Sequence, residues 1–406
     1  MGNNVTENLS LVEALFGGDL FQTSLCLIAV FLASTALLMN LIPKVPVLRK
    51  ATFVPFLFLG PMILSSLDVI PGSHPLYRPL QSLTLYMAIF FMVVAIDVGQ
   101  ILRSLQTRVV LLFLLGCLGT AAGSVAAFLL FIPALGAEPS AMVAACMTGA
   151  YTGGSMNWVA VGEALDVPDT LSAIAFPAMV IVYTIYLGIV LALDYSPLRP
   201  VIERWLGAGN GDATCGIESN EPAPAAAPRL CDYINGFLAF CAVYLASIFL
   251  EQLVEGLVFI PMVIFLTSLT ILMGAVLPRI SPAGARGLGS MSTFGEASLY
   301  FLLGVIGAQA TLTESLLHAP ILLLVPVLVI FVHVLVLLIS ARFLKVDLVT
   351  TSIVSIATIG GAASAPAAAG ALNRPALIPL GVLLGSLGYV VGTYLGVYLG
   401  YFLLMR

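Results

Sequence analysis

The sequence has 406 residues and a net charge of −5, with 60% hydrophobic and only 9% charged residues. A soluble domain carries about a quarter charged residues, so this composition and a mean hydropathy of +1.11 exclude a soluble globular protein. Apolar runs of about 20 residues recur along the chain, which is the length of a transmembrane helix and about twice that of a barrel strand. We therefore expect an all-α, multi-pass protein of the lipid bilayer, without a nucleic-acid partner.

A tail at 1–20 precedes the first apolar run. Two apolar segments, 139–165 and 347–372, are interrupted at their centres by Gly-Gly. The long polar stretch 196–230 is rich in Gly, Pro and Ala, which is typical of a linker, here a cytoplasmic one. Ten other apolar segments have the length of full spans: 21–43, 51–70, 82–101, 109–134, 170–194, 232–250, 257–277, 294–312, 319–341 and 376–404.

The linker divides the chain into halves at 21–195 and 231–406 that repeat one another. A shift of 207 positions superposes Gly153-Gly154 on Gly360-Gly361 and also Pro168 on Pro375. The order of the apolar segments around these positions matches as well. The sequence therefore predicts two transmembrane repeats of about five spans, each with its own glycine-broken helix or re-entrant hairpin.

Basic residues discriminate between two topologies. If both glycine-broken segments cross the membrane, six Lys and Arg lie on one side and nine on the other, against the positive-inside tendency. If each segment enters and returns, thirteen lie on one side and only Arg78 and Arg406 on the other. The second topology is favoured, and it makes the repeats inverted with their Gly-Gly tips meeting near the middle. A crossing broken helix is the alternative.

Broken helices at membrane depth expose backbone groups that can bind a solute or an ion. A half-helix that starts at a glycine tip presents free N–H groups and a positive dipole end to an anion, while freed carbonyls and hydroxyls suit a hard cation. Close helix packing by small residues is the alternative reading. The candidate solute-binding residues are Gly153, Gly154, Ser155, Asn157, Gly360, Gly361 and Ser364. The candidate cation ligands are Thr152, Ser155, Asn157 and Thr358.

Several other polar residues lie in or beside apolar runs. Asp97 is the candidate coupling acid, with a pair to Arg103 at the interface as the alternative. His333 is expected to be a hydrogen-bonded packing residue. Pro366 suits the first turn of a helix and predicts a half-helix that starts around Ser364. The remaining candidates are Glu163, Asp166 and Asp169 at a hairpin mouth, and Glu296 and Gln309 at the ends of the eighth span.

Motifs of enzymes are missing from the sequence. It contains no Walker-type phosphate loop, no His-Glu-x-x-His and no Gly-x-Ser-x-Gly. We therefore expect no enzymatic activity and no cofactor, with Na⁺ as the candidate coupling ion.

Three motifs carry a resemblance to a known family: TGAYTGGSMNWVAVGEAL, SIATIGGAASAPAAAGAL and GVLLGSLGYVVGTYLG. Over essentially the whole chain they resemble the family called domain of unknown function 819, polytopic proteins mainly of bacteria. The second motif departs from that family's Asn-x-Gly-Gly-Pro-Thr form, with Thr358 in place of Asn and Ala362-Ala363 after the glycines. The resemblance implies a superfamily that contains cation/proton antiporters and sodium-dependent bile-acid, glutamate and citrate carriers. It also implies elevator-like motion and a homodimer in the bacterial inner membrane.

Together these features predict a secondary active transporter, with sodium-coupled symport of a small anionic organic solute as the leading interpretation. A cation/proton antiporter is the first alternative. A membrane scaffold or receptor without solute flux is the second.

Overall fold

The computed structural model describes residues 10–12, 19–41, 54–94, 105–194, 196–207, 229–254, 261–309, 319–372 and 374–405. Every regular element in these ranges is a helix. The first half contains α2 (Leu20–Leu41), α3 (Val54–Ser66), α4 (Tyr77–Val93), α6 (Thr107–Leu135), α7 (Ala137–Gly153), α8 (Ser155–Ala164) and α9 (Asp169–Leu193), followed by α10 (Arg199–Leu206). The second half contains α11 (Leu230–Val254), α12 (Met262–Ile280), α13 (Pro282–Gly289), α14 (Ser292–Gln309), α16 (Ala319–Leu344), α17 (Leu348–Ala371), the 3-10 helix η3 (Pro375–Leu377) and α18 (Ile378–Leu404).

The described helices are those of an integral, multi-pass membrane protein, as expected from composition. Eight helical stretches within the described residues are long and apolar enough to cross a membrane. Two of the ten predicted spans, 51–70 and 82–101, are represented by the shorter α3 and α4, of 13 and 17 residues. The predicted linker begins as a helix, because Arg199 at the start of α10 pairs with Asp194 at 2.5 Å and with Glu203 at 2.8 Å. Residues 208–228 of that linker lie outside the described ranges.

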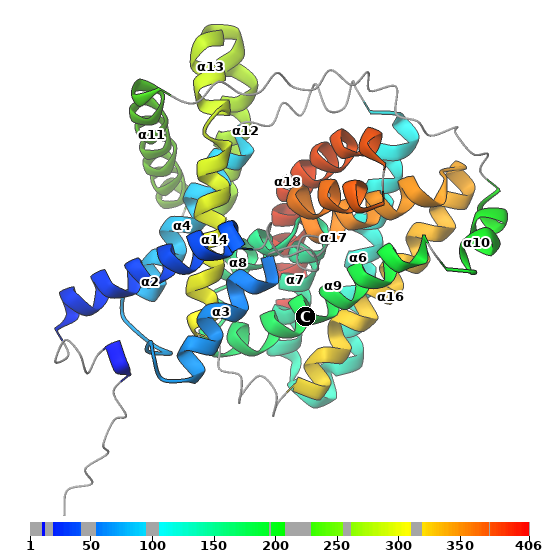
Figure 1. Cartoon of the computed structure of the whole chain (residues 1–406), viewed down its shortest axis with the longest axis horizontal. Helices are drawn as coiled ribbons and strands as arrows, with labels where there is room; N and C mark the ends of the chain where they lie inside the picture. Colours follow the sequence, from blue (N-terminus) through cyan, green and yellow to red (C-terminus); the bar gives the residue numbers. More distant parts are fainter. Residues whose placement is uncertain are drawn as a thin grey trace, which may run out of the picture.

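The helices form two bundles that lie side by side (Figure 1). The α14 bundle contains α2, α3, α4, α11, α12 and α14, with α14 packed most extensively on α3 and α4. The α18 bundle contains α6, α7, α8, α9, α16, α17 and α18, with α6 packed on α16 and α18 packed on both α7 and α17. Far fewer residues pack between the bundles than within them, and α8 lies at the boundary.

Each half of the chain contributes to both bundles in the same order. Apart from the short α13, which packs on α11 and α12, three described helices of each half go to the α14 bundle, and then a long helix, a glycine-broken segment and a second long helix go to the α18 bundle. This order matches the predicted duplication. The inverted orientation of the halves stays a prediction.

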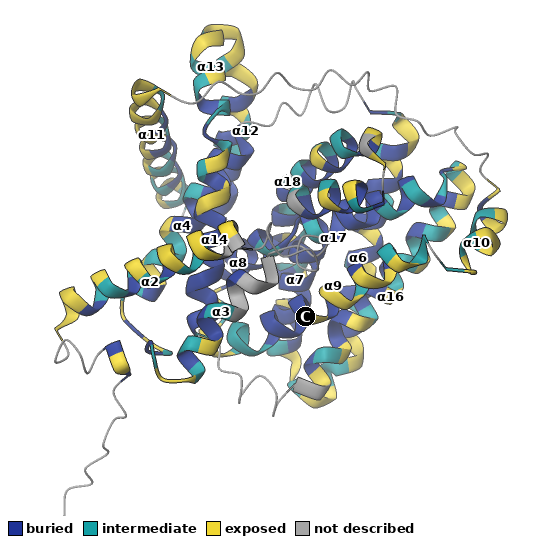
Figure 2. Ribbon diagram, viewed as in Figure 1, coloured by how far each residue is buried: buried dark blue, intermediate teal, exposed yellow. Residues whose placement is uncertain are grey.

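Many exposed side chains on the outer helices are apolar, as a lipid-facing surface requires. Figure 2 shows the exposed residues along the outer faces of helices such as α2 and α11. Leu238 and Phe249 of α11 are 68% and 63% exposed, and Leu25 and Leu32 of α2 are also exposed. The buried side chains concentrate where the two bundles meet and around α7. The interior is therefore built around the first glycine-broken segment.

Candidate functional site

The first glycine-broken segment is a helical hairpin. Gly154, between α7 and α8, has φ +92° and ψ 178°, a conformation that side chains with a Cβ rarely adopt. A Cβ placed on Gly149 would lie 2.7 Å from Cγ2 of Val161 and 3.0 Å from the Asn157 carbonyl oxygen. α8 thus folds back along α7, and the segment is a helical hairpin. That this hairpin enters the membrane and returns on the same side stays a prediction.

The second glycine-broken segment turns at the equivalent residue. Gly361 interrupts α17 with φ +72° and ψ −167°, and it lies 207 positions after Gly154. A Cβ on Gly360 would lie 2.8 Å from the Cβ of Ser364, whereas Cβ atoms four residues apart in a regular helix are about 5–6 Å apart. The chain therefore turns sharply here.

The predicted start of the second half-helix around Ser364 is wrong. The helix resumes directly after Gly361, so Pro366 lies inside the new helix rather than at its first position. The physical reason is that the positive φ of the turn requires a glycine, and the glycine pair therefore sets the break irrespective of the proline downstream.

The two Gly-Gly tips meet, as the sequence predicted. A Cβ on Gly154 would lie 3.5 Å from the Gly360 carbonyl oxygen, and one on Gly361 would lie 3.0 Å from the Gly153 carbonyl oxygen. Backbone therefore contacts backbone at the tips, with no room for side chains.

Both glycine-broken segments pack against a row of glycines on α18. Gly381 contacts Ala365 and Gly385 contacts Ala362, both in the arm that follows the second tip. Further along, a Cβ on Gly388 would lie 2.5 Å from the Thr152 carbonyl oxygen, and one on Gly392 would lie 2.7 Å from that of Gly149. The first segment thus lies along the C-terminal part of α18 and the second along its N-terminal part. The two tips approach from opposite ends of this helix.

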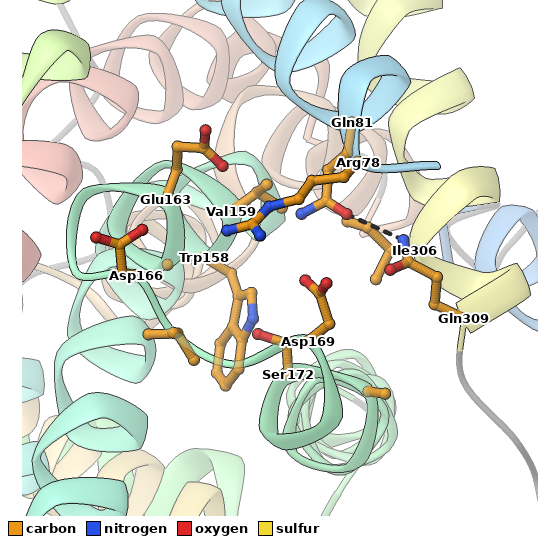
Figure 3. A pocket seen from close by; sticks show the side chains of 13 residues that line it. Arg78, Gln81, Trp158, Val159, Glu163, Asp166, Asp169, Ser172, Ile306 and Gln309 are labelled. Atoms are coloured by element: carbon orange, nitrogen blue, oxygen red, sulfur yellow. Dashed lines mark hydrogen bonds between the residues drawn. The ribbon is translucent and has the colours of Figure 1, made fainter. Parts of the chain in front are cut away.

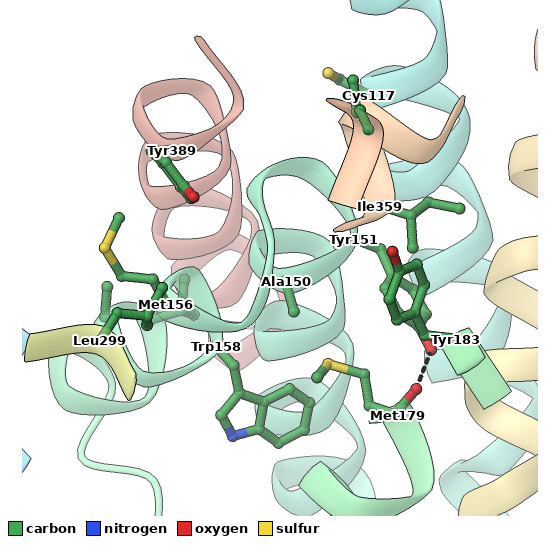
Figure 4. Packing of buried hydrophobic residues seen from close by; sticks show 14 of the residues in the cluster. Cys117, Ala150, Tyr151, Met156, Trp158, Met179, Tyr183, Leu299, Ile359 and Tyr389 are labelled. Atoms are coloured by element: carbon green, nitrogen blue, oxygen red, sulfur yellow. Dashed lines mark hydrogen bonds between the residues drawn. The ribbon is translucent and has the colours of Figure 1, made fainter. Parts of the chain in front are cut away.

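A pocket opens at the tips between the two bundles, and we call it the tip pocket. Figure 4 shows some of its lining side chains, including Tyr183 and Tyr389, within the surrounding hydrophobic packing. The α18 bundle lines it with tip residues, with Tyr183 of α9 and with Tyr389 of α18. The α14 bundle lines it with Met92 of α4 and with Glu296, Leu299 and Tyr300 of α14. The pocket is therefore shared by the two bundles.

The predicted solute-binding residues divide between the tip pocket and the packing behind it. Gly154, Ser155, Gly360 and Ser364 line the pocket. Gly153 and Gly361 contact each other's segment and α18 instead. Asn157 is fully buried and its Nδ2 donates to the Gly388 carbonyl oxygen at 3.1 Å.

The predicted cation ligands do not all converge on the pocket, where only Ser155 of the four is found. Thr358 donates its hydroxyl to the Val354 carbonyl oxygen at 2.8 Å, within its own helix. Because the Gly388 carbonyl requires a donor, the Nδ2 of Asn157 faces it and the Oδ1 points away. Oδ1 of Asn157 and Oγ1 of Thr152 are buried without a hydrogen-bond partner among the described residues. Asp97, the candidate coupling acid, lies outside the described residues, as does Arg103.

Glu296 is the charged side chain of the tip pocket. It lies in the second turn of α14, within the stretch Pro282–Gln309 that is long and apolar enough to cross a membrane. Acids at membrane depth are costly and usually functional, so the sequence carried a signal for this residue. Tyr183, Tyr300 and Tyr389 had no such signal, because only the packing of the helices brings these tyrosines to the pocket.

His333 holds the α18 bundle together, which supports its reading as a packing residue. Its Nδ1 lies 3.0 Å from the Gly116 carbonyl oxygen and its Nε2 lies 2.9 Å from Oγ of Ser355. Since a carbonyl only accepts, we assign the proton to Nδ1, and Nε2 then accepts from Ser355. Thr120, 3.0 Å from the same Nδ1, also donates to the Tyr151 carbonyl oxygen at 3.2 Å. This network connects α6, α16 and both glycine-broken segments.

A second pocket lies on the other flank of α8, where its end and the start of α9 face α4 and α14 (Figure 3). Arg78, Glu163, Asp166 and Asp169 line this polar pocket, in agreement with the predicted hairpin mouth. The Glu163 carboxylate accepts hydrogen bonds from Ser82 at 3.1 Å and from Tyr86 at 3.2 Å, both from α4. Glu163 therefore links the two bundles.

Comparison with known proteins identifies relatives of this chain. Residues 26–406 match the family described as "Protein of unknown function (DUF819)". The chain is also 26% identical over 355 residues to the uncharacterized membrane protein YjcL of Bacillus subtilis (strain 168), a match that covers 82% of this chain and 85% of YjcL. Because the family match extends over nearly the whole sequence, the chain belongs to the DUF819 family of membrane proteins.

Proposed function

We propose that this protein is a secondary active transporter of the bacterial inner membrane, and that the tip pocket holds its solute. One observation carries the proposal: two glycine-broken segments meet tip to tip from opposite ends of α18 and open on a pocket shared by two bundles. Broken helices that meet at the centre of a membrane protein supply backbone groups for binding without exposing them to lipid.

The solute of this proposal is a small organic molecule with an anionic group. α8 begins at the tip, and no side chain caps its N-terminus. The free N–H groups of its first turn and the positive end of its dipole lie beside Gly154 and Ser155, which line the pocket. A carboxylate seated there would complete the hydrogen bonds of this helix end.

Sodium is the proposed coupling ion. Two buried oxygens next to the first tip, Thr152 Oγ1 and Asn157 Oδ1, have no hydrogen-bond partner among the described residues. Oxygen atoms of hydroxyl, amide and backbone carbonyl groups form the donor set of a hard cation. These two side chains fit such an ion and would hold it beside the first tip.

Motion of the α18 bundle along the α14 bundle would carry the solute, in the manner of an elevator. The bundles pack on each other far less than each packs internally. Side-chain hydrogen bonds that cross between them include those of Ser82 and Tyr86 to Glu163 and a 2.7 Å contact between Ser268 and Tyr394. Because most hydrogen bonds stay within a bundle, a bundle can move as a unit.

Proteoliposome uptake tests this proposal. Radiolabelled monocarboxylates, dicarboxylates and amino acids are offered with an inward sodium gradient, with an equal sodium concentration on both sides, and without sodium. We expect at least one solute to accumulate only when the inward sodium gradient is present. Equal uptake in all three conditions, for a solute that binds, removes the sodium coupling.

Glycine variants test whether the tips form the site. A Cβ on Gly360 would collide with the Tyr183 hydroxyl, so Gly360→Val should abolish uptake. Gly188 has no atom within 4 Å of its Cβ position, and Gly188→Ala is the matched control that should retain uptake. Preserved uptake by a folded Gly360→Val protein contradicts the location of the site.

Glu296 favours a second candidate, exchange of a cation for protons. It is an acid within an apolar stretch and it lines the tip pocket. A pH-sensitive dye inside the vesicles separates the two functions. A sodium or potassium pulse without any organic solute changes the internal pH only if the protein is an antiporter.

A further inference from the structure

The charge of the tip pocket is informative about the solute. Glu296 lines the pocket, and no Lys, Arg or His does so among the described residues. A solute that carried only negative charge would approach this carboxylate at membrane depth, where charges interact more strongly than in water. A positive group on the same solute would remove that repulsion.

Other lining residues of the pocket suit an anion. The uncapped N-terminus of α8 lies there, beside Gly154 and Ser155. Tyr183 provides an independent observation, because the residue is 8% exposed and lines the pocket, and its buried hydroxyl lies beside Ser364 without making a hydrogen bond of good geometry to it. A buried hydroxyl without a partner is costly, and a ligand oxygen that accepts its proton would remove that cost.

Tyrosine side chains line the tip pocket together with Glu296. Tyr300 lies one helical turn from Glu296 on α14, and Tyr389 of α18 lines the same pocket. The faces of tyrosine rings attract ammonium groups, most strongly where water is excluded. The pocket thus offers a negative charge and rings to a cation, and N–H and O–H donors to an anion.

We propose that the solute of the tip pocket is a small zwitterion, with its carboxylate at the N-terminus of α8 and the Tyr183 hydroxyl and its ammonium group at Glu296. This inference rests on the proposed transport function and narrows its solute class. It assigns Glu296 to solute binding.

Matched solutes test the proposal by calorimetry on the purified full-length protein in detergent with sodium. The zwitterions are alanine, leucine, phenylalanine and trimethylglycine. Each α-amino acid is compared with the carboxylate that lacks its amino group and with the amine that lacks its carboxylate. We expect at least one zwitterion to bind about tenfold or more tightly than both of its partners, since one lost charge contact of this kind is worth about one decade.

Glu296→Gln is the decisive variant, because it removes the charge and keeps the shape. It should weaken binding of that zwitterion about tenfold and leave the matched carboxylate unchanged or bound more tightly. Glu138→Gln is the control, since Glu138 is exposed at the start of α7 and lines neither pocket described above. Thermal unfolding of each variant confirms that it folds.

Three outcomes overturn the proposal. The first is a carboxylate that binds as tightly as its amino acid, and the second is a panel in which no zwitterion binds. The third is proton movement driven by sodium alone and lost in Glu296→Gln, which would assign this acid to ion exchange. Failure of the transport function is distinguishable, because a zwitterion that binds in calorimetry but is never taken up by proteoliposomes refutes transport and retains the solute class.

Discussion

The two glycine-broken segments share one backbone turn and differ in the side chains around it. Both turn at the second glycine of the pair with positive φ, and both lie against the glycines of α18. The first places two unpartnered buried oxygens, of Thr152 and Asn157, beside its turn. In the second segment, the Thr358 hydroxyl donates a hydrogen bond to a carbonyl of its own helix. The comparison teaches that the backbone turn is duplicated, whereas the two unpartnered buried oxygens of Thr152 and Asn157 lie beside the first turn.

The largest effects are expected at the turns themselves. Gly154→Ala and Gly361→Ala each force a Cβ into a positive-φ, extended-ψ conformation that is almost exclusive to glycine, at a cost of about 1–3 kcal/mol. Gly361→Ala should be the more damaging, because its new Cβ would lie 3.0 Å from the Gly153 carbonyl oxygen. The new Cβ of Gly154→Ala would lie no closer than 3.5 Å to its nearest neighbour. Thermal unfolding in detergent measures both losses.

Gly370→Ala is the control for the turns, because Gly370 lies in the same helix with no atom within 4 Å of its Cβ position. This variant should unfold at the wild-type temperature or slightly above it, since alanine favours a helix. Equal stability of all three variants would show that neither turn requires its glycine.

His333 connects the two segments, and its loss should have the second largest effect. His333→Leu leaves the Gly116 carbonyl and the Ser355 hydroxyl without this partner and should cost about 2–3 kcal/mol. The double variant His333→Leu/Ser355→Ala should lose less stability than the sum of the losses in the two single variants, because the two side chains share one hydrogen bond. Strictly additive losses in thermal unfolding would mean that the two side chains do not interact.

Thr152 and Thr358 form a matched pair for the sodium site. Thr152→Val removes a buried hydroxyl that has no partner, so without sodium the variant should be more stable by about 1 kcal/mol. Stabilisation of the protein by added sodium should shrink in this variant, because a cation ligand is gone. Thr358→Val should respond to sodium like the wild type. An undiminished sodium response in Thr152→Val would place the ion elsewhere.

The helical spans and the turns could be predicted because they depend on local chemistry. A membrane-length apolar run forms a helix in lipid, and a glycine pair within it permits positive φ, so the break at Gly154 and its counterpart at Gly361 are readable from the sequence. The preference of proline for the first turn of a helix predicted a start near Ser364, which is too late, because the glycine pair and not Pro366 sets the turn.

The composition of the tip pocket could not be predicted, because it depends on how the bundles meet. Glu296 and Tyr183 are more than 100 positions apart in sequence and reach the same pocket from different bundles. Asn157 was recognisable as a buried amide, yet its direction depends on the Gly388 carbonyl of α18. The glycines of α18 belong to a family motif that the sequence shows, and only the structure shows that both glycine-broken segments pack against them.

The smallest effect is expected at the hairpin mouth, where the two segments differ again. Glu163 of the first segment links the bundles through Ser82 and Tyr86, whereas the position 207 residues later is Gly370, which has no side chain to do so. In Glu163→Ala the α18 bundle should be released from α4 more easily. Water replaces these hydrogen bonds at the polar mouth, so the change should be about 1 kcal/mol or less, which corresponds to about a fivefold rise in transport turnover at most.

Glu163→Gln refines this last prediction, because its amide keeps one acceptor oxygen for Ser82 or Tyr86 but loses the charge. Its turnover in proteoliposomes at saturating solute should lie between those of the wild type and of Glu163→Ala. The exposed Glu138→Ala should match the wild type. If Glu163→Ala instead changes solute affinity at constant turnover, Glu163 contributes to the binding site rather than to the contact between the bundles, and solute-binding groups then lie at both ends of α8.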